Sequence, residues 1–218
     1  MPVLTIASSK GGPGKTTVCQ ALAAGLAGQF RIVALDADPT QALSRWANNT
    51  YEGPPFEAMA EPDETRLAHL IAAKAESYDF VLVDTAGFGN RAATVAMTSA
   101  DAVLVPSLSG EADVTEAEKT MRLVEGLARA ARRDIPARVL LNRVRRTTLA
   151  RHAAAEIKAA GLHRLTTTLS DLVAYGEMTY SGRLPVTGQC AAEIAALVAE
   201  LRELGWIPES ALQQHVVA

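Results

Sequence analysis

Five runs of apolar residues alternate along the chain with segments in which apolar residues recur every three or four positions. The apolar runs, each expected to be a buried strand, cover 2–8, 31–38, 79–87, 100–108 and 137–144. The segments with helical spacing cover 16–28, 40–49, 63–77, 114–133, 148–161 and 191–205. Strands that are apolar throughout and alternate with helices are typical of a parallel sheet covered on both faces. The pattern predicts one α/β domain over 1–218, with a mostly parallel twisted sheet, helices on both faces and an inserted loop at 52–62.

The first apolar run leads into a glycine-rich loop, ASSKGGPGKTTV at 7–18, and then into a helix. The letters GKT at 14–16 match the end of the phosphate-binding pattern GxxxxGK[ST], although Ser9 stands where that pattern begins with glycine. Glycines at 11 and 12 let backbone N–H groups face phosphate oxygens, and the helix N-terminus adds partial positive charge. Lys15 is then expected to neutralise the β- and γ-phosphates, and the Thr16 hydroxyl to bind Mg²⁺. The alternative is a loop that only connects a strand to a helix.

Carboxylates follow two more of the apolar runs. Asp36 and Asp38 end the second run, and Asp84 follows four apolar residues in the third. In open α/β sheets, ligands bind outside the carboxyl ends of the strands, so these side chains are expected beside the loop. Asp84 suits a contact with Mg²⁺ through water, and the Asp36–Asp38 pair suits metal-water contact and the positioning of an attacking water. The alternative for Asp38 is that, with Pro39, it starts the helix over 40–49.

Composition narrows the class of protein. The chain has 218 residues, a formal net charge of −3 and two cysteines without a CxxC pair, which argues against a disulfide framework or a structural zinc site. No apolar stretch is long enough for a membrane span, and no signal peptide is recognisable. These features predict a cytoplasmic protein.

The motifs together resemble a known family. KGGPGKTT looks like the deviant Walker A motif of the ParA/MinD family of P-loop ATPases, LDADPTQALSRW resembles its switch I, and VLVDTAG its Walker B. The resemblance is closest to the small ParA-type partition ATPases without an N-terminal DNA-binding domain, and weaker likeness extends over most of the chain. Two departures stand out: Gln41 lies one residue later than in the family's usual DPQ, and DTAGFGN replaces its DCPP or DTPP.

The resemblance implies roles for individual residues. Lys10 is expected to reach across a dimer to the phosphates of the other subunit, and Asp38 to activate water. It implies a catalytic set of Lys10, Lys15 and Asp38, and metal contacts at Thr16, Asp36 and Asp84. Asn142 is expected to form a hydrogen bond with adenine, and Arg143 lies next to it in the sequence. The expected ATP-binding residues are Lys10, Gly11, Gly12, Pro13, Gly14, Lys15, Thr16, Thr17, Asn142 and Arg143.

The implied function is an ATP- and Mg²⁺-dependent dimerising ATPase switch that partitions plasmid or chromosomal DNA, or positions another cargo. The resemblance implies a homodimer in the ATP state, nonspecific DNA binding, a nucleoid-associated location, and a ParB-like or ribbon-helix-helix centromere-binding partner. A metabolic P-loop enzyme, of amidoligase or dethiobiotin-synthase type, is one alternative. A membrane-recruited MinD-like regulator is another, but the tail PESALQQHVVA contains no Lys or Arg, so no membrane contact is expected.

Arginines are concentrated between 129 and 151. This window holds eight arginines and one acid, Asp134, so its charge is +7 in a chain of −3. A basic patch can bind DNA phosphates without sequence preference, and the alternative is a solvated helix end whose arginines pair with nearby acids. The residues predicted to contact DNA are Arg129, Arg132, Arg133, Arg145, Arg146 and Arg151.

Overall fold

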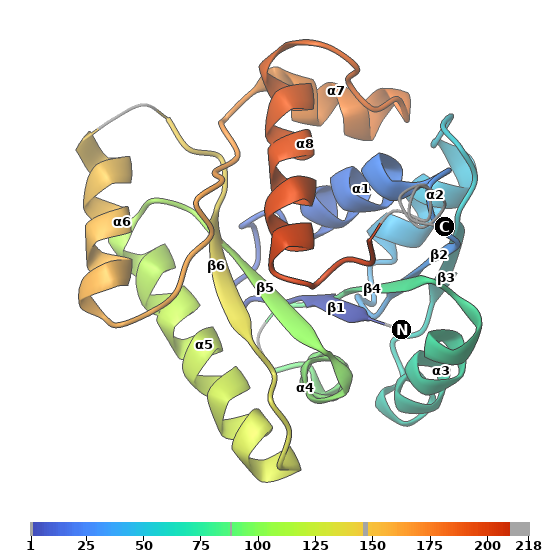
Figure 1. Ribbon diagram of the computed structural model, residues 1–218, viewed down its shortest axis with the longest axis horizontal. Coiled ribbons are helices and arrows are strands. Elements are labelled where there is room, and N and C mark those ends of the chain that lie inside the picture. The colour runs from blue at the N-terminus through green and yellow to red at the C-terminus, as the bar shows by residue number, and fades with distance from the viewer. Residues whose placement is uncertain (1, 88, 146–147, 210–218) are drawn as a thin grey trace, which may run out of the picture.

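The computed structural model describes residues 2–87, 89–145 and 148–209. Its core is a six-stranded sheet in the order β3-β2-β4-β1-β5-β6, and every pairing between these strands is parallel (Figure 1). The strands are β1 Val3–Ile6, β2 Ile32–Asp36, β3 Glu57–Ala60, β4 Phe80–Asp84, β5 Ala102–Ser107 and β6 Ala137–Leu141. The helices are α1 Lys15–Leu26, α2 Ala42–Asn49, α3 Glu64–Ser77, α4 Arg91–Ser99, α5 Glu111–Ala131, α6 Thr148–Ala159, α7 Val173–Ser181 and α8 Gly188–Glu203.

Alternate side chains of each central strand point to opposite faces of the sheet. In β4, Leu82 packs in one cluster with Leu22 of α1 and Leu197 of α8, whereas Val83 packs in another with Leu67 of α3. The same alternation places α1, α2, α7 and α8 on one face and α3, α4, α5 and α6 on the other. Burial on both faces explains why these strands are apolar throughout. The predicted fold class, a parallel α/β sheet covered on both sides, is confirmed.

The strand register brings the chemistry-bearing residues to one edge. Ile6 at the end of β1 and Asp36 at the end of β2 each pair with Asp84 at the end of β4. Because all three strands run the same way, the loops that follow them leave the sheet side by side. The candidate site therefore lies at the carboxyl edge, where β1 stands between β4 and β5.

Three elements differ from the sequence expectations. The segment 52–62, expected to be a loop, contains β3, an edge strand whose side chains are mostly half-buried and which pairs only with β2. The helices α4 and α7 were not predicted either. Both are nine residues long, so each offers only about two turns of periodicity for detection.

Cys19 and Cys190 are free and buried. Within the described ranges, no helix is both long enough and apolar enough to cross a membrane.

Asp63 caps the start of α3. The Asp63 side chain accepts hydrogen bonds from the backbone N–H groups of Thr65, at 3.0 Å, and Arg66, at 2.9 Å. These two donors lack partners inside the helix, so the carboxylate satisfies both.

Replacing this cap supplies a test of the fold. Asp63→Ala should lower the free energy of unfolding by about 1 kcal/mol, because two helix donors lose their acceptor. Glu76→Ala is the matched control, since it removes an exposed carboxylate from the last turn of the same helix. Urea unfolding of the two variants should differ; an equal loss in both would contradict the capping role.

Candidate functional site

The loop between β1 and α1 forms one wall of a cavity of about 670 Å³. The shape of the loop depends on Gly14, which adopts the left-handed conformation with φ of 89° immediately before α1. A Cβ at this position would also lie 2.4 Å from Nδ2 of Asn142, so a side chain has no room. The N-terminus of α1 therefore adjoins the cavity, with its unpaired N–H groups and partial positive charge available to an anion.

Lys15 lies on the cavity wall and is buried, with 7% of its surface exposed. Its Nζ has two long contacts of 3.4 Å, to the Ser8 hydroxyl and to the Lys10 backbone oxygen. Burial lowers the pKa of Lys15, while nearby Asp84 and Asp38 oppose this shift. A buried ammonium with only long contacts is poorly compensated, and phosphate oxygens in the cavity would supply the missing partners.

Thr16 and Asp84 meet beside Lys15. The Thr16 hydroxyl donates a 2.7 Å hydrogen bond to Oδ2 of Asp84, and Oδ1 of this fully buried carboxylate has no hydrogen-bond partner. Burial raises the pKa of Asp84 to about 7, because the charged form loses water. An unpartnered buried carboxylate oxygen next to a hydroxyl fits Mg²⁺, which prefers oxygen ligands.

The side chains here fit a cation that bound phosphates would also help to coordinate. Among the described residues, no group of three or more His, Cys, Asp or Glu side chains could hold a metal by itself. Mg²⁺ usually binds through one or two carboxylates together with water and substrate phosphates. Thr16 and Asp84 are the residues that would hold it here, and the cation would neutralise charge on the phosphates.

Asp36 organises the segment that carries Asp38. Its Oδ1 accepts from the Asp38 N–H at 3.2 Å and its Oδ2 accepts from the Ser44 N–H at 2.9 Å. Burial raises the pKa of Asp36, and these two backbone donors counteract the shift. Asp36 is thus placed to position the segment that carries Asp38. It also pairs with Asp84 in the strand register, and its contact with a metal stays a prediction.

Asp38 lines the cavity and is half-buried, as expected for a residue facing bound phosphates. Its Oδ1 accepts from the Thr40 N–H at 2.8 Å, which forms a local turn. The helix α2 begins only at Ala42, after Gln41 in the left-handed conformation with φ of 53°. Asp38 and Pro39 therefore do not start this helix, and the capping alternative is wrong.

Asn142 and Arg143 also line the cavity. The Asn142 amide is buried, donates to the Pro13 backbone oxygen at 2.7 Å and accepts from the Arg143 N–H at 2.9 Å. One amide hydrogen and one oxygen lone pair remain for a ligand. Asn142 thus ties the end of β6 to the phosphate-binding loop, and its contact with adenine stays a prediction.

One part of the cavity wall could not be recognised in the sequence. It consists of residues from α7 and the segment before it: Ser170, Asp171, Leu172, Val173, Tyr175, Gly176 and Thr179. This segment is placed by a bridge between Ser170 and Val144, just beyond the end of β6, and by Glu193 of α8. Glu193 binds the Ser170 N–H and hydroxyl and the Tyr175 hydroxyl. No repeating pattern marks such a segment, so only the fold could assign it to the site.

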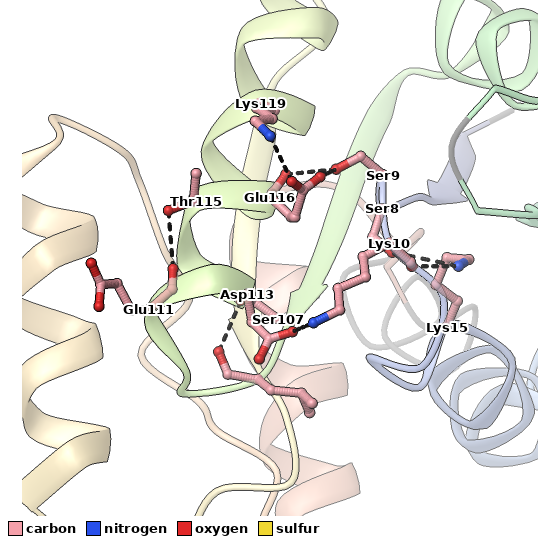
Figure 2. A network of polar contacts seen from close by, with 11 residues as sticks. Ser8, Ser9, Lys10, Lys15, Ser107, Glu111, Asp113, Thr115, Glu116 and Lys119 are labelled. Atoms are coloured by element: carbon pink, nitrogen blue, oxygen red, sulfur yellow. Dashed lines mark hydrogen bonds and ion pairs between the residues drawn. The ribbon is translucent and has the colours of Figure 1, made fainter.

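Lys10 behaves differently from Lys15. It is not among the described residues that line the cavity, and its Nζ lies 2.8 Å from Oδ1 of Asp113 in the first turn of α5. Figure 2 shows the Lys10 side chain directed toward α5 and the Lys15 side chain on the other side of the loop. The two lysines of the motif thus have separate surroundings within one subunit.

The arginines predicted to bind DNA fall into two groups. Arg129, Arg132 and Arg133 lie where α5 ends, beside the start of β6, whereas Arg145 and Arg151 lie beyond the end of β6. We call these two places the two poles of the arginine window. The helix α5 runs between them, and its 21 residues span about 32 Å at 1.5 Å per residue. Arg146 lies outside the described residues. The window is therefore not one continuous patch, because a strand and a long helix separate its halves.

Several of these arginines have acidic neighbours. Arg129 pairs with Glu125, Arg133 with Asp101 at 2.9 Å, and Arg145 with Asp171 at 2.8 Å. Arg143 also lies 3.6 Å from Asp171. Arg132 and Arg151 are exposed. These ion pairs reduce the positive electrostatic potential that DNA would meet. The charge of +7 over 129–151 therefore overstates the attraction of this segment for phosphates.

The chain is similar in sequence to proteins of one family. A sequence model of the VirC1 protein family matches residues 1–212. The chain is 35% identical to virC1 of Rhizobium radiobacter over 150 residues, 66% of this chain and 65% of that protein. It is 31% identical to virC1 of Rhizobium rhizogenes, covering 86% and 84% of the two chains. It is 28% identical to maintenance of carboxysome distribution protein A of Halothiobacillus neapolitanus, covering 87% and 91%.

Solved structures share the fold. An ATP complex of an McdA variant from Cyanothece superposes with a TM-score of 0.77 at 18% identity, covering 96% of this chain and 98% of that one. MinD from Pyrococcus horikoshii with Mg-ADP gives 0.76 at 20% identity, covering 94% and 97%. At these identities the likeness establishes the fold alone.

The site geometry predicts which lysine controls nucleotide affinity. Lys15→Ala should weaken ATP binding to the monomer roughly 10- to 100-fold, because a hydrogen bond to a charged group contributes about 1.5–3 kcal/mol. Lys10→Ala should leave that affinity nearly unchanged, since Lys10 is directed away from the cavity. Titration of a fluorescent ATP analogue at low protein concentration measures both. Equal losses in the two variants would contradict the separate roles.

Proposed function

Because the chain belongs to the VirC1 family of ParA/MinD-type P-loop ATPases, we propose that it is an ATPase switch. It binds Mg²⁺ and ATP, forms a homodimer in the ATP state and returns to the monomer after hydrolysis. The dimer positions a cargo, either DNA or a body attached to a partner protein. Two relatives carry names that fit such work, "Protein ParA" of Rhizobium radiobacter and the carboxysome distribution protein.

The observation that carries this proposal is the separation of the two lysines. Lys15 supplies the charge for the bound phosphates of its own subunit, and Lys10 remains at the loop surface, outside the cavity. A second lysine that does not serve its own site is available to a neighbouring one. A cation introduced in trans during phosphoryl transfer accelerates the reaction by about 10³- to 10⁵-fold. Dimerisation would then control hydrolysis.

The remaining roles follow from position. Asp38, on the cavity wall, orients the attacking water, and Asp36 holds the segment that carries it. Thr16 and Asp84 hold Mg²⁺, and Asn142 with the wall of residues 170–179 surrounds the base. Catalysis of this kind rests on positioning and on electrostatic stabilisation, with no covalent intermediate on the protein.

Two partners would allow the switch to move a cargo: a protein that stimulates hydrolysis and a DNA surface. A ParB-like or ribbon-helix-helix centromere-binding protein would stimulate hydrolysis and release the dimer. Nonspecific binding to nucleoid DNA would provide the surface on which the switch moves. If dimers form through the carboxyl edge, the arginines there come together from two subunits, whereas those at the end of α5 stay apart. The carboxyl-edge group therefore fits ATP-dependent DNA binding better.

Mixing two inactive variants tests the shared site. Lys10→Ala and Asp38→Ala should each lose ATPase activity, by roughly 10³-fold for Lys10→Ala. In a mixed dimer, the Lys10→Ala chain keeps Asp38 and receives Lys10 from its partner, so one site is complete. Each mixed dimer should regain at most about half of the wild-type rate, because only one of its two sites works.

The matched control replaces the Lys10→Ala chain by one that carries both substitutions. No site is then complete, and mixing with Asp38→Ala should restore nothing. Activity that stays absent in the first mixture, while both variants bind ATP and dimerise, would place Lys10 in its own subunit's site. This result would favour a metabolic P-loop enzyme over a dimerising switch.

Charge reversal at the two poles tests the DNA surface. Arg151→Glu should weaken DNA binding in ATP by several-fold and reduce the slope of log affinity against log salt by about one, because a phosphate contact is lost. Arg132→Glu is the matched control, since it is equally charged and exposed but lies at the opposite pole. Fluorescence anisotropy with a random duplex measures both. A larger effect from Arg132→Glu would move the DNA surface to the other pole.

A further inference from the structure

One face of α5 is fastened to the phosphate-binding loop. Its residues Asp113, Glu116 and Thr120 follow one another at spacings of three and four, so they lie in one line along the helix. The Ser9 N–H donates to the Thr120 hydroxyl at 2.9 Å, and the Ser9 hydroxyl lies 2.8 Å from a backbone and a carboxylate oxygen of Glu116. The Lys10–Asp113 ion pair continues this line of contacts into the first turn (Figure 2).

The ion pair occupies the lysine that the proposed function needs elsewhere. Lys10 has 48% of its side chain exposed and Asp113 has 15%, so the carboxylate is the better-fixed partner. Gly110, just before α5, leaves space for it: a Cβ there would lie 2.8 Å from Oδ2 of Asp113. The lysine is thus held against its own subunit by an acid that the surrounding chain keeps in place.

We propose that Asp113 is a latch that holds Lys10 in its own subunit, so that nucleotide bound to a second subunit has to compete for this lysine. This inference rests on the proposed function, in which Lys10 acts in trans. When the Lys10 ammonium group turns from Asp113 toward the phosphates of another subunit, it gives up this ion pair. The latch therefore opposes dimerisation until phosphates are present on the partner.

The geometry allows the latch to open without disturbing the loop. The contacts of Ser9 with Glu116 and Thr120 do not involve the Lys10 side chain, so the loop stays docked when the lysine swings away. Asp113 also keeps a stabilising partner, because a carboxylate in the first helical turn interacts favourably with the positive end of the helix. Opening thus requires only a side-chain rotation and the loss of one ion pair.

The size of the effect follows from the exposure of the pair. Ion pairs that water reaches typically change an equilibrium by between one- and fivefold. A symmetric dimer opens two latches, so the factors multiply. Removing Asp113 should therefore lower the dimer dissociation constant about tenfold, if each latch contributes about threefold.

Dimerisation in the presence of Mg²⁺ and the slowly hydrolysed analogue AMPPNP tests the latch. Analytical ultracentrifugation should give an about tenfold lower dissociation constant for Asp113→Asn than for the wild type. Glu111→Gln is the matched control: it removes the same charge from the same turn of α5, two residues away, and should stay within about twofold of the wild type. In a Lys10→Ala background, Asp113→Asn should have no further effect.

A second variant keeps the acid and disturbs only its position. Gly110→Ala places a methyl group against the Asp113 carboxylate, in a backbone conformation with φ of −78° that alanine adopts readily. It should shift dimerisation in the same direction as Asp113→Asn, and it replaces that variant if the Asn chain does not fold.

The outcomes separate the latch from the proposed function. A wild type that stays monomeric with AMPPNP overturns the proposed switch, and the latch with it. A wild type that dimerises while Asp113→Asn is unchanged overturns the latch alone. Weaker dimerisation of Asp113→Asn also overturns it, because Asp113 would then be orienting Lys10 toward the partner.

Discussion

The central position of β1 in the parallel sheet is the constraint on which the site depends. Because β1 lies between β4 and β5, the loop that follows it emerges beside Asp84 on one side and beside the start of α5 on the other. The first neighbour places the Thr16 hydroxyl 2.7 Å from a carboxylate oxygen, and the second places Lys10 against Asp113. A parallel sheet with another strand order would separate these groups, whatever the sequence of the loop.

The same geometry gives a physical account of Ser9, which stands where the common phosphate-binding pattern has glycine. Its N–H and hydroxyl reach Thr120 and Glu116, so the residue fastens the first half of the loop to α5. The second half of the loop, from Gly12 to Thr16, keeps the glycines and the helix N-terminus that phosphate binding requires. The loop thus has a half that is bound to α5 and a half that is open to the cavity.

Much of this arrangement could be predicted from the sequence, because buried parallel strands and a phosphate-binding loop leave local signals. The apolar runs located β1, β2, β4, β5 and β6, and GKT located Lys15 and Thr16. The strand β3 left little signal, since an edge strand with half-exposed side chains need not be apolar. The wall at 170–179 and the pair Lys10–Asp113 join segments far apart in the chain, so they depend on packing that no local pattern records. The separation of the arginines between 129 and 151 also depends on the fold, because β6 lies between Arg133 and Arg145; their contact with DNA stays a prediction.

The ion pair between Lys10 and Asp113, at the surface of this site, is weak enough to break and form again. The hydrogen bonds in and beside the cavity wall are buried for Asp36 with Ser44 and Asn142 with Pro13, and partly buried for Thr16 with Asp84. Breaking one of them would leave a polar group unsatisfied at a cost of about 1–3 kcal/mol, enough to keep the cavity in one form. The Lys10–Asp113 pair is reached by water, and pairs of this kind contribute about 0.2–1 kcal/mol. In the proposed switch, a nucleotide on the partner subunit, with its several negative charges, overcomes that amount, and its loss lets the lysine return to Asp113. The rigid cavity and the easily released lysine therefore occupy two sides of the same short loop.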